Sequence, residues 1–268
     1  MTGIPRCALS LPFCSRLGNT ERTTIMNSPM VETIRAKIEA VHRRKHVVLS
    51  DGTRKQITGA VRTDEAARMA ALILERQCRS TLETGVAFGV STLAICLALD
   101  AVNADTIHYG VDPEQWSVHQ GAAVALHDEH GIQTPLRILE GCSHEVLPAL
   151  LKEGVQLDFA FIDGWHTFDY TLLDFFYIDK LLKPRGVVAF HDCWMPSKRK
   201  VLRYITTHRK YRLLPYPKAR LNLSLRRLAR SAWRGSPDPA FFLARRADLL
   251  MLEKLEDWEP NFDYFENF

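Results

Sequence analysis

The sequence predicts an α/β protein in which a mostly parallel sheet carries helices on both faces. From about residue 80 onward, short strand-like runs alternate with helical patterns. Strand–helix–strand units at this spacing form parallel sheets. The chain has 268 residues, of which 46% are hydrophobic and 25% charged, as in a globular protein. This length is sufficient for one domain of that class with some additions.

Composition and motif content exclude several other classes. The longest apolar runs are far shorter than the roughly 20 residues that cross a bilayer, so no transmembrane segment is expected. The N-terminus lacks the apolar core of a secretory signal. The formal net charge of +4 is too small to indicate nucleic acid by itself. The six cysteines form no C-x-x-C pair, which favours reduced thiols in a cytoplasmic protein.

The N-terminal part of the chain is expected to form an arm ahead of the main domain. Residues 1–29 are predicted to be a disordered leader, because alternative start methionines lie near their end. Apolar residues recur at helical spacing over 31–41, and residues 47–57 form two short runs around an Asp-Gly turn. Residues 30–62 are therefore expected to form a helix and a hairpin.

The main domain is predicted over residues 63–247. Thr63 or Asp64 can cap its first helix, which runs to about residue 77. Strands are then expected at residues 81–86, 107–111, 136–139, 157–162 and 186–190, and helices near residues 91–102, 115–129, 143–153 and 168–182. Residues 211–214 and 241–244 are expected to add a terminal antiparallel pair of strands.

Charge is distributed unevenly in the last third of the chain. Residues 194–247 contain 15 Lys or Arg and one acid, whereas residues 249–268 contain six acids and one Lys. A basic insert over 216–239 and an acidic C-terminal tail over 248–268 are expected. The insert can be a solvated helix, a mobile cap that selects an anionic acceptor, or a helix on an anionic membrane. The cap is favoured over the membrane helix because the insert lies between the last two strands.

A glycine-rich turn follows the first strand of the main domain. Glu83 and Gly85 end this strand, and Gly89 and Ser91 lead into a helix. Glycines at such a turn allow a ligand to approach the backbone amides at the helix N-terminus. The turn has neither the G-x-G-x-x-G spacing of dinucleotide-binding proteins nor the lysine of a phosphate loop.

Small or acidic residues follow the next two strands. Asp112, after the second strand, can accept hydrogen bonds from ribose hydroxyls, or it can cap a helix before Pro113. Cys142 and Ser143, after the third strand, leave room for a flat ring, although Ser143 is also a plausible helix N-cap.

Carboxylates and imidazoles follow the fourth and fifth strands. Asp163 ends the fourth strand with His166 three residues later, and His191 and Asp192 end the fifth. If these strands are neighbours, the four side chains meet at one rim of the sheet. Such a group suits a divalent cation or acid–base catalysis. The alternative is that the two Asp residues cap the helices that follow.

Taken in order, these motifs resemble the class I S-adenosylmethionine-dependent methyltransferases, and in particular the small-molecule O-methyltransferases of the catechol and macrocin types. The resemblance covers residues 63–192. It rests on Glu83-x-Gly85-x-x-x-Gly89-x-Ser91-Thr92, Gly110-Val111-Asp112, Phe161-Ile162-Asp163-Gly164-x-His166 and His191-Asp192. It implies a Rossmann-like, seven-stranded, mostly parallel sheet with an antiparallel last strand, and O-methylation of a small molecule or glycan.

The resemblance also implies roles for individual residues. The cofactor S-adenosylmethionine would be held by Glu83, Gly85, Gly89, Ser91, Asp112, Cys142, Ser143 and Asp163. Asp112 would bind the ribose hydroxyls, and Cys142 and Ser143 would line the adenine. His166 would act as the general base.

A divalent cation is a further implication of the resemblance. Asp163 and Asp192 match carboxylates that bind Mg²⁺ in metal-dependent members. Catechol-type enzymes have Asn where this chain has Cys193, and macrocin-type enzymes have an acid where it has His191. With His191 as a third ligand, the preference moves from Mg²⁺ toward Mn²⁺, Fe²⁺ or Zn²⁺.

Two rival functions remain open from the sequence. The basic segment permits a nucleic-acid methyltransferase, although the fourth strand is not followed by the Asn/Asp-Pro-Pro-aromatic motif of enzymes that methylate base nitrogens. Nucleic acid is therefore the less favoured partner. The other rival is a methyltransferase-like protein without methyl transfer activity. An oligomer is compatible with either function.

Overall fold

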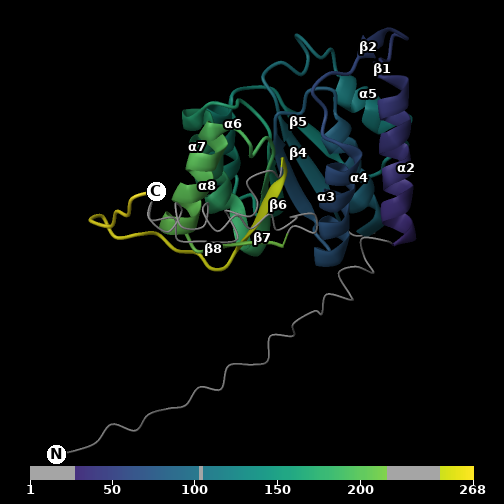
Figure 1. Ribbon diagram of the computed structural model, residues 1–268. Helices are drawn as coiled ribbons and strands as arrows, with labels where there is room; N and C mark the ends of the chain where they lie inside the picture. Colours follow the sequence, from purple (N-terminus) through teal and green to yellow (C-terminus); the bar gives the residue numbers. More distant parts are fainter. Residues whose placement is uncertain (1–27, 103–104, 216–247) are drawn as a thin grey trace, which may run out of the picture.

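The computed structural model describes residues 28–102, 105–215 and 248–268 (Figure 1). Its centre is a seven-stranded sheet of order β5-β4-β3-β6-β7-β9-β8. The strands are β3 (Ser80–Thr84), β4 (Ile107–Val111), β5 (Leu136–Leu139), β6 (Leu157–Ile162), β7 (Leu182–Phe190), β8 (Tyr211–Leu213) and β9 (Leu250–Lys254). β3 to β7 are parallel, and β9 runs antiparallel to β7 and β8. The predicted α/β class with an antiparallel strand near the end is confirmed.

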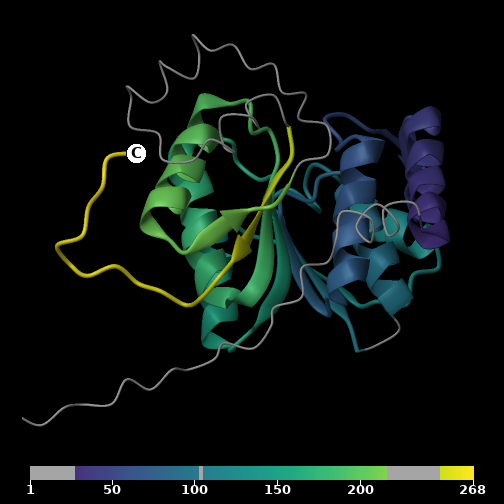
Figure 2. The same ribbon diagram turned by 60° about the horizontal axis from the view of Figure 1, so that its bottom comes forward.

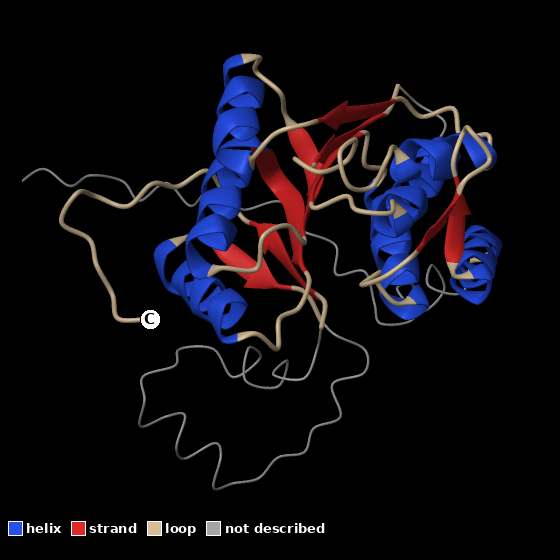
Figure 3. Ribbon diagram, turned by 90° about the horizontal axis from the view of Figure 1, so that it is seen from above, coloured by secondary structure: helices blue, strands red, loops and turns tan. Residues whose placement is uncertain are grey.

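Helices cover both faces of this sheet, as predicted (Figures 2 and 3). One face carries α2 (Pro29–Arg44), α3 (Thr63–Arg76), α4 (Val90–Val102) and α5 (Ala122–Glu129), and the other carries α6 (Ser143–Lys152), α7 (Phe168–Leu181) and α8 (Pro196–His208). Side chains of β6 alternate between the two cores, with Phe161 on the α4 side and Ile162 on the α7 side. In the described ranges, no helix has the length and apolar character needed to cross a membrane.

The N-terminal arm has the predicted helix and hairpin. In α2 the Ser28 hydroxyl caps the first turn by accepting from the Val31 amide at 3.3 Å, and the buried stripe of the helix packs on α3. β1 (His46–Val48) and β2 (Arg54–Gln56) pair antiparallel around the Asp-Gly turn. Since α2 begins at Pro29, the end of the predicted leader already belongs to the fold. Residues 1–27 lie outside the described residues.

The last strand of the sheet is a correction to the sequence prediction. β9 lies within the segment predicted to be an acidic tail, whereas the strand expected at 241–244 and the insert expected at 216–239 fall outside the described residues. β9 is buried along its whole length between β7 and β8. Central strands with two covered faces have continuous apolar runs instead of alternation, and Leu249–Leu252 is such a run.

Several element boundaries also differ from the prediction. The N-cap of α3 is Arg62, whose backbone amide donates to the Glu65 carboxylate at 3.0 Å. The N-cap of α6 is Cys142 instead of Ser143. α5 is shorter than expected, because turns occupy the residues before Ala122. β7 begins at Leu182, and α8 was not predicted.

The described cysteines are free thiols, and three of them are buried. Burial raises the pKa of both Cys78 and Cys193 to about 12, so these thiols remain protonated and unreactive near neutral pH. The cytoplasmic location expected from the cysteine pattern stays a prediction.

Candidate active site

The glycine-rich turn joins β3 to α4 at the carboxyl edge of the sheet. Its backbone is left-handed at Gly85 (φ +84°), Ala87 (φ +47°) and Gly89 (φ +80°). Asp112 Oδ2 accepts hydrogen bonds from the amides of Val86 at 3.1 Å and Ala87 at 2.7 Å. The end of β4 therefore holds the turn in shape, in addition to any contact that Asp112 makes with a ligand.

Both glycines of the turn are required by close packing within the protein. A Cβ atom on Gly85 would lie 2.4 Å from the carbonyl oxygen of Asp163, and one on Gly89 would lie 2.5 Å from the Cα of Ala123. Real Cβ atoms do not approach other atoms so closely. The turn is thus pressed directly against the end of β6, where the candidate catalytic residues begin.

Glu83 and Ser91 lie beneath the turn and bind each other. The Ser91 hydroxyl donates to Glu83 Oε2 at 2.7 Å, and Thr92 also donates to this carboxylate. His108 Nε2 lies 3.0 Å from Glu83 Oε1. Because Glu83 is fully buried, these contacts tie β3 to α4 and β4. A direct contact of Glu83 or Ser91 with a cofactor stays a prediction.

Asp112, Cys142 and Ser143 lie where the prediction placed them, at the ends of β4 and β5. Asp112 does not cap α5, whose N-cap is Gly121. Cys142 is half-buried and Ser143 is buried in the first turn of α6. Their position at the same sheet edge as Asp112 is compatible with an adenine site.

Asp163, His191 and Asp192 form one cluster, which we call the acidic cluster. β6 and β7 are adjacent, and Ile162 pairs with Phe190, so the residues after each strand lie side by side. One ligand atom from each of the three residues lies within 4.8 Å of the others. Neither Asp caps a helix, because α7 is capped at Thr167 and α8 at Met195. The functional interpretation is therefore favoured over helix capping.

Electrostatics in the acidic cluster are dominated by His191. Its Nδ1 lies 3.1 Å from Asp163 Oδ1 and 3.6 Å from Asp192 Oδ2. Burial lowers the pKa of His191, but hydrogen bonds to Asp163, Asp192 and Glu65 outweigh it and raise the pKa to about 12. The hydrogen bond from His191 lowers the pKa of Asp192 to about 2, whereas burial raises the pKa of Asp163.

His166 lies beside the acidic cluster and is positioned by it. Its Nε2 is 3.4 Å from Asp192 Oδ2, while its Nδ1 has no hydrogen-bond partner among the described residues. The Ser197 hydroxyl donates to the His166 carbonyl at 2.7 Å and fixes the loop. The Trp194 indole N–H donates to Asp192 Oδ1 at 2.9 Å. An imidazole oriented by a carboxylate is a candidate general base. Its Nδ1 is buried, so an acceptor would reach this nitrogen only after a movement of the His166 side chain or its loop.

The acidic cluster fits a divalent cation by the chemistry of its donors. Two carboxylates and one imidazole converge, and all three side chains keep some exposure. Such a mixed oxygen and nitrogen set suits Mn²⁺, Fe²⁺ or Zn²⁺ better than Mg²⁺. To bind the ion, His191 would present Nδ1, the nitrogen that faces both carboxylates.

Glu65 is a site residue that the sequence analysis missed. It comes from α3, is only 2% exposed, and its Oε2 lies 3.3 Å from His191 Nε2. A signal for it was present in the sequence. Glu65 lies on the buried face of α3, four residues before Met69 and seven before Leu72, so an acid stands on an apolar helix face.

Lys198 of α8 was missed as well. It is fully buried, and its Nζ lies 3.5 Å from the Ile162 carbonyl oxygen at the end of β6. Burial lowers its pKa. Burial also raises the pKa values of Asp163 and Asp174, and the charge of Lys198 offsets part of that rise. No sequence signal separates Lys198 from the other basic residues around it.

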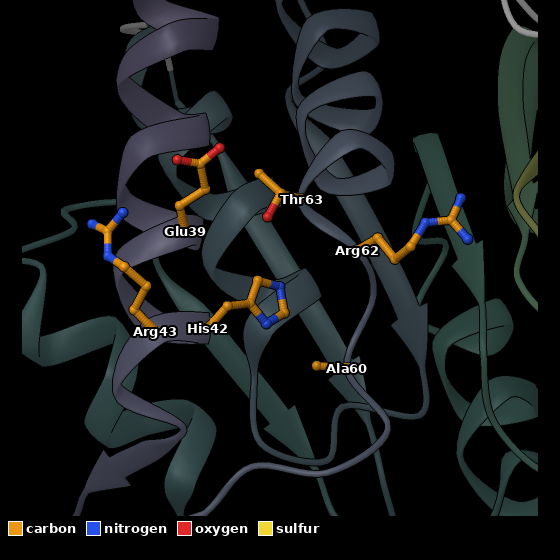
Figure 4. A pocket seen from close by; sticks show the side chains of 6 residues that line it. All are labelled: Glu39, His42, Arg43, Ala60, Arg62 and Thr63. Carbon is orange, nitrogen blue, oxygen red and sulfur yellow. The ribbon is translucent and has the colours of Figure 1, made fainter.

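An open hollow of about 450 Å³ lies between α2 and the start of α3 (Figure 4). It is lined by Glu39, His42, Arg43, Ala60, Arg62 and Thr63. The Arg62 side chain points away from the other lining side chains in Figure 4 and forms an ion pair with Glu65 at 3.0 Å. The hollow contains none of the predicted site residues, but Arg62 connects its edge to the acidic cluster through Glu65.

Comparisons with known proteins show similarity in the domain and in the fold. A family model described as a methyltransferase domain matches residues 82–193. A search of curated proteins finds no match to the chain.

Solved structures of similar fold include three from bacteria. The O-methyltransferase TomG of Streptomyces achromogenes, involved in tomaymycin synthesis and solved with S-adenosylmethionine, is 18% identical (TM-score 0.52; 70% of this chain and 82% of that chain covered). An O-methyltransferase of Bacillus cereus in complex with S-adenosylhomocysteine is 14% identical (TM-score 0.52; 70% and 83%). A Klebsiella pneumoniae protein described as a candidate O-methyltransferase is 13% identical (TM-score 0.54; 86% and 91%). At these identities the likeness establishes the fold.

Proposed function

We propose that the chain, in which residues 82–193 match a methyltransferase domain on a class I fold, is an S-adenosylmethionine-dependent methyltransferase that methylates a hydroxyl group of a small molecule or glycan. The observation that carries the proposal is the His166–Asp192 pair beside Asp163, at the same sheet edge as the glycine-rich turn. The similar proteins from Streptomyces achromogenes and Bacillus cereus are O-methyltransferases.

The proposed cofactor site is the turn at residues 85–91 together with the ends of β4 and β5. The backbone of the turn, closed by Asp112, would bind the methionine and ribose portions, and Cys142 and Ser143 would line the adenine. TomG and the Bacillus cereus enzyme were crystallised with S-adenosylmethionine and S-adenosylhomocysteine, respectively, which supports this choice of cofactor.

The proposed reaction is an in-line displacement. The acceptor oxygen attacks the methyl carbon, the carbon–sulfur bond breaks with its electron pair going to sulfur, and S-adenosylhomocysteine leaves. His166 takes the hydroxyl proton, and Asp192 stabilises the imidazolium that forms. A divalent ion held by Asp163, His191 and Asp192 would lower the pKa of the acceptor hydroxyl when bound. Positioning of the two reactants supplies much of the remaining acceleration.

Calorimetric titration of the full chain with S-adenosylhomocysteine, with and without Mn²⁺, tests the cofactor and the metal together. Binding of S-adenosylhomocysteine alone is expected, and a separate Mn²⁺ binding event is expected beside it. Turnover is then measured as S-adenosylhomocysteine released in the presence of a panel of hydroxylated rings and sugars. No binding of S-adenosylhomocysteine would contradict the proposal at its first step.

Asp192→Ala is expected to abolish turnover with little change in affinity for S-adenosylhomocysteine. The reason is that Asp192 contacts His166 and His191 but not the glycine-rich turn. Calorimetry and the release assay measure the two quantities on one preparation. Full wild-type turnover in excess chelator would remove the metal from the mechanism and leave His166 as the base.

A further inference from the structure

Two carboxylates flank the His191 imidazole, with one carboxylate at each ring nitrogen. Nδ1 lies 3.1 Å from Asp163 Oδ1, and Nε2 lies 3.3 Å from Glu65 Oε2. Asp163 comes from the end of β6, whereas Glu65 comes from the first turn of α3. The ring orientation therefore depends on a helix that contributes none of the predicted site residues.

The Glu65 carboxylate is itself held in place. It accepts the Arg62 backbone amide at 3.0 Å, and its Oε1 forms an ion pair with the Arg62 guanidinium at 3.0 Å. Burying a carboxylate costs several kcal/mol unless it is paired and hydrogen-bonded. Helix capping alone accounts for the contacts with Arg62, but it does not account for the approach of Oε2 to His191.

We propose that Glu65 is the positioning residue of the acidic cluster: by accepting a hydrogen bond from His191 Nε2, it aims Nδ1 at Asp163 and Asp192, where a divalent cation binds. This inference rests on the proposed function, because the cation is part of that proposal. A carboxylate behind a histidine ligand fixes the tautomer and ring orientation and makes the facing nitrogen a stronger donor. Loss of such a partner weakens metal binding about 10- to 100-fold.

The test compares Glu65→Gln with the wild type and with Glu75→Gln. Gln retains the size of Glu65 but removes its charge. Glu75 lies on the same helix, about 15 Å further along its axis, so the control makes the same chemical change away from His191. Mn²⁺ affinity is measured by calorimetry on the full chain, S-adenosylhomocysteine affinity is measured on the same samples, and circular dichroism checks the folded fraction.

The expected result is an affinity for Mn²⁺ about 10- to 100-fold lower in Glu65→Gln, with unchanged affinity for S-adenosylhomocysteine and wild-type behaviour of Glu75→Gln. Wild-type Mn²⁺ affinity in Glu65→Gln would overturn the inference. If the wild type binds no Mn²⁺, both the inference and the metal part of the proposed function fail. Binding of S-adenosylhomocysteine and methyl transfer in that sample then decide separately whether the proposed methyltransferase function stands.

A double-mutant cycle separates positioning from a general effect on the fold. Because Glu65 acts through His191, adding Glu65→Gln to His191→Gln is expected to cause no further loss of Mn²⁺ affinity. Additive losses would mean that Glu65 acts by another route. Should Glu65→Gln fold poorly, ¹⁵N spectra of the histidine-labelled wild type provide the second measurement. In the Zn²⁺-bound protein, His191, identified by the signal missing in His191→Gln, is expected to bind the ion through Nδ1 and to carry its proton on Nε2 in a hydrogen bond, and an unprotonated Nε2 would overturn the inference.

Discussion

Replacement of His166 by alanine is expected to lower the kcat of methyl transfer by about 100- to 10,000-fold, the usual contribution of a general base. The affinity for S-adenosylhomocysteine is expected to stay at the wild-type value. His166 faces Asp192 at 3.4 Å and lies in the loop after β6, so its removal deprives the acceptor hydroxyl of a proton acceptor without changing the glycine-rich turn. Initial rates of S-adenosylhomocysteine release, with the acceptor found in the panel, measure the effect.

His130→Ala is the matched control for this experiment. His130 lies at the C-terminal end of α5, where its Nδ1 is 2.9 Å from the Leu126 carbonyl. This variant is expected to retain wild-type turnover and cofactor affinity. If His166→Ala also turned over at the wild-type rate, the proton would leave by another route, and His166 would not be the base.

Gly85→Ala is expected to reduce the free energy of unfolding by about 3 kcal/mol, the sum of two costs. A left-handed φ costs a non-glycine residue about 1 kcal/mol. The added Cβ would also lie 2.4 Å from the carbonyl oxygen of Asp163, and overpacking of this kind costs about 1 to 3 kcal/mol. Urea denaturation monitored by circular dichroism measures the change.

Gly59→Ala measures the first of these costs alone, so the difference between the two variants gives the second. Gly59 has φ +65°, but a Cβ there would meet nothing within 4 Å. The control is therefore expected to lose only about 1 kcal/mol. Equal stability of the two variants would show that the turn can move away from β6 at no cost. The overlap is with protein backbone, so the glycine-rich turn must shift to accommodate the new Cβ. We therefore expect Gly85→Ala to bind S-adenosylhomocysteine more weakly, in addition to its loss of stability.

Local patterns in the sequence predicted the central architecture and the place of the candidate site. The strands at 107–111, 136–139 and 157–162 were predicted with the bounds they have in the structure. Their apolar runs are bounded by turn residues and separated by helical periodicity, so the signal is local. Because parallel strands end at one edge of a sheet, the order of elements alone also predicted that Asp163 would meet His191 and Asp192.

Only the tertiary structure decided which side chains act together. The sequence did not reveal that Glu83 is buried and bonded to Ser91, Thr92 and His108, whereas its predicted contact with the cofactor stays a prediction. Glu65 contacts His191 across 126 positions of the chain. Periodicity tells which face of an element a side chain occupies. The hydrogen-bond partner of a side chain depends on which other element packs against its face. The choice of that element is set by packing between segments far apart in the chain.

The same reason explains the misplaced last strand. A β-strand has no hydrogen bonds of its own, so the neighbours with which it pairs decide where it lies. Leu250–Lys254 becomes a central strand because it pairs with β7 on one side and with β8 on the other. Both faces of the strand are covered at this position. Its sequence, an apolar run followed by acids, resembles the start of a tail until those neighbours are present. Local patterns thus predicted the fold class and the sheet edge that carries the candidate site, while long-range packing decided which side chains contact one another there.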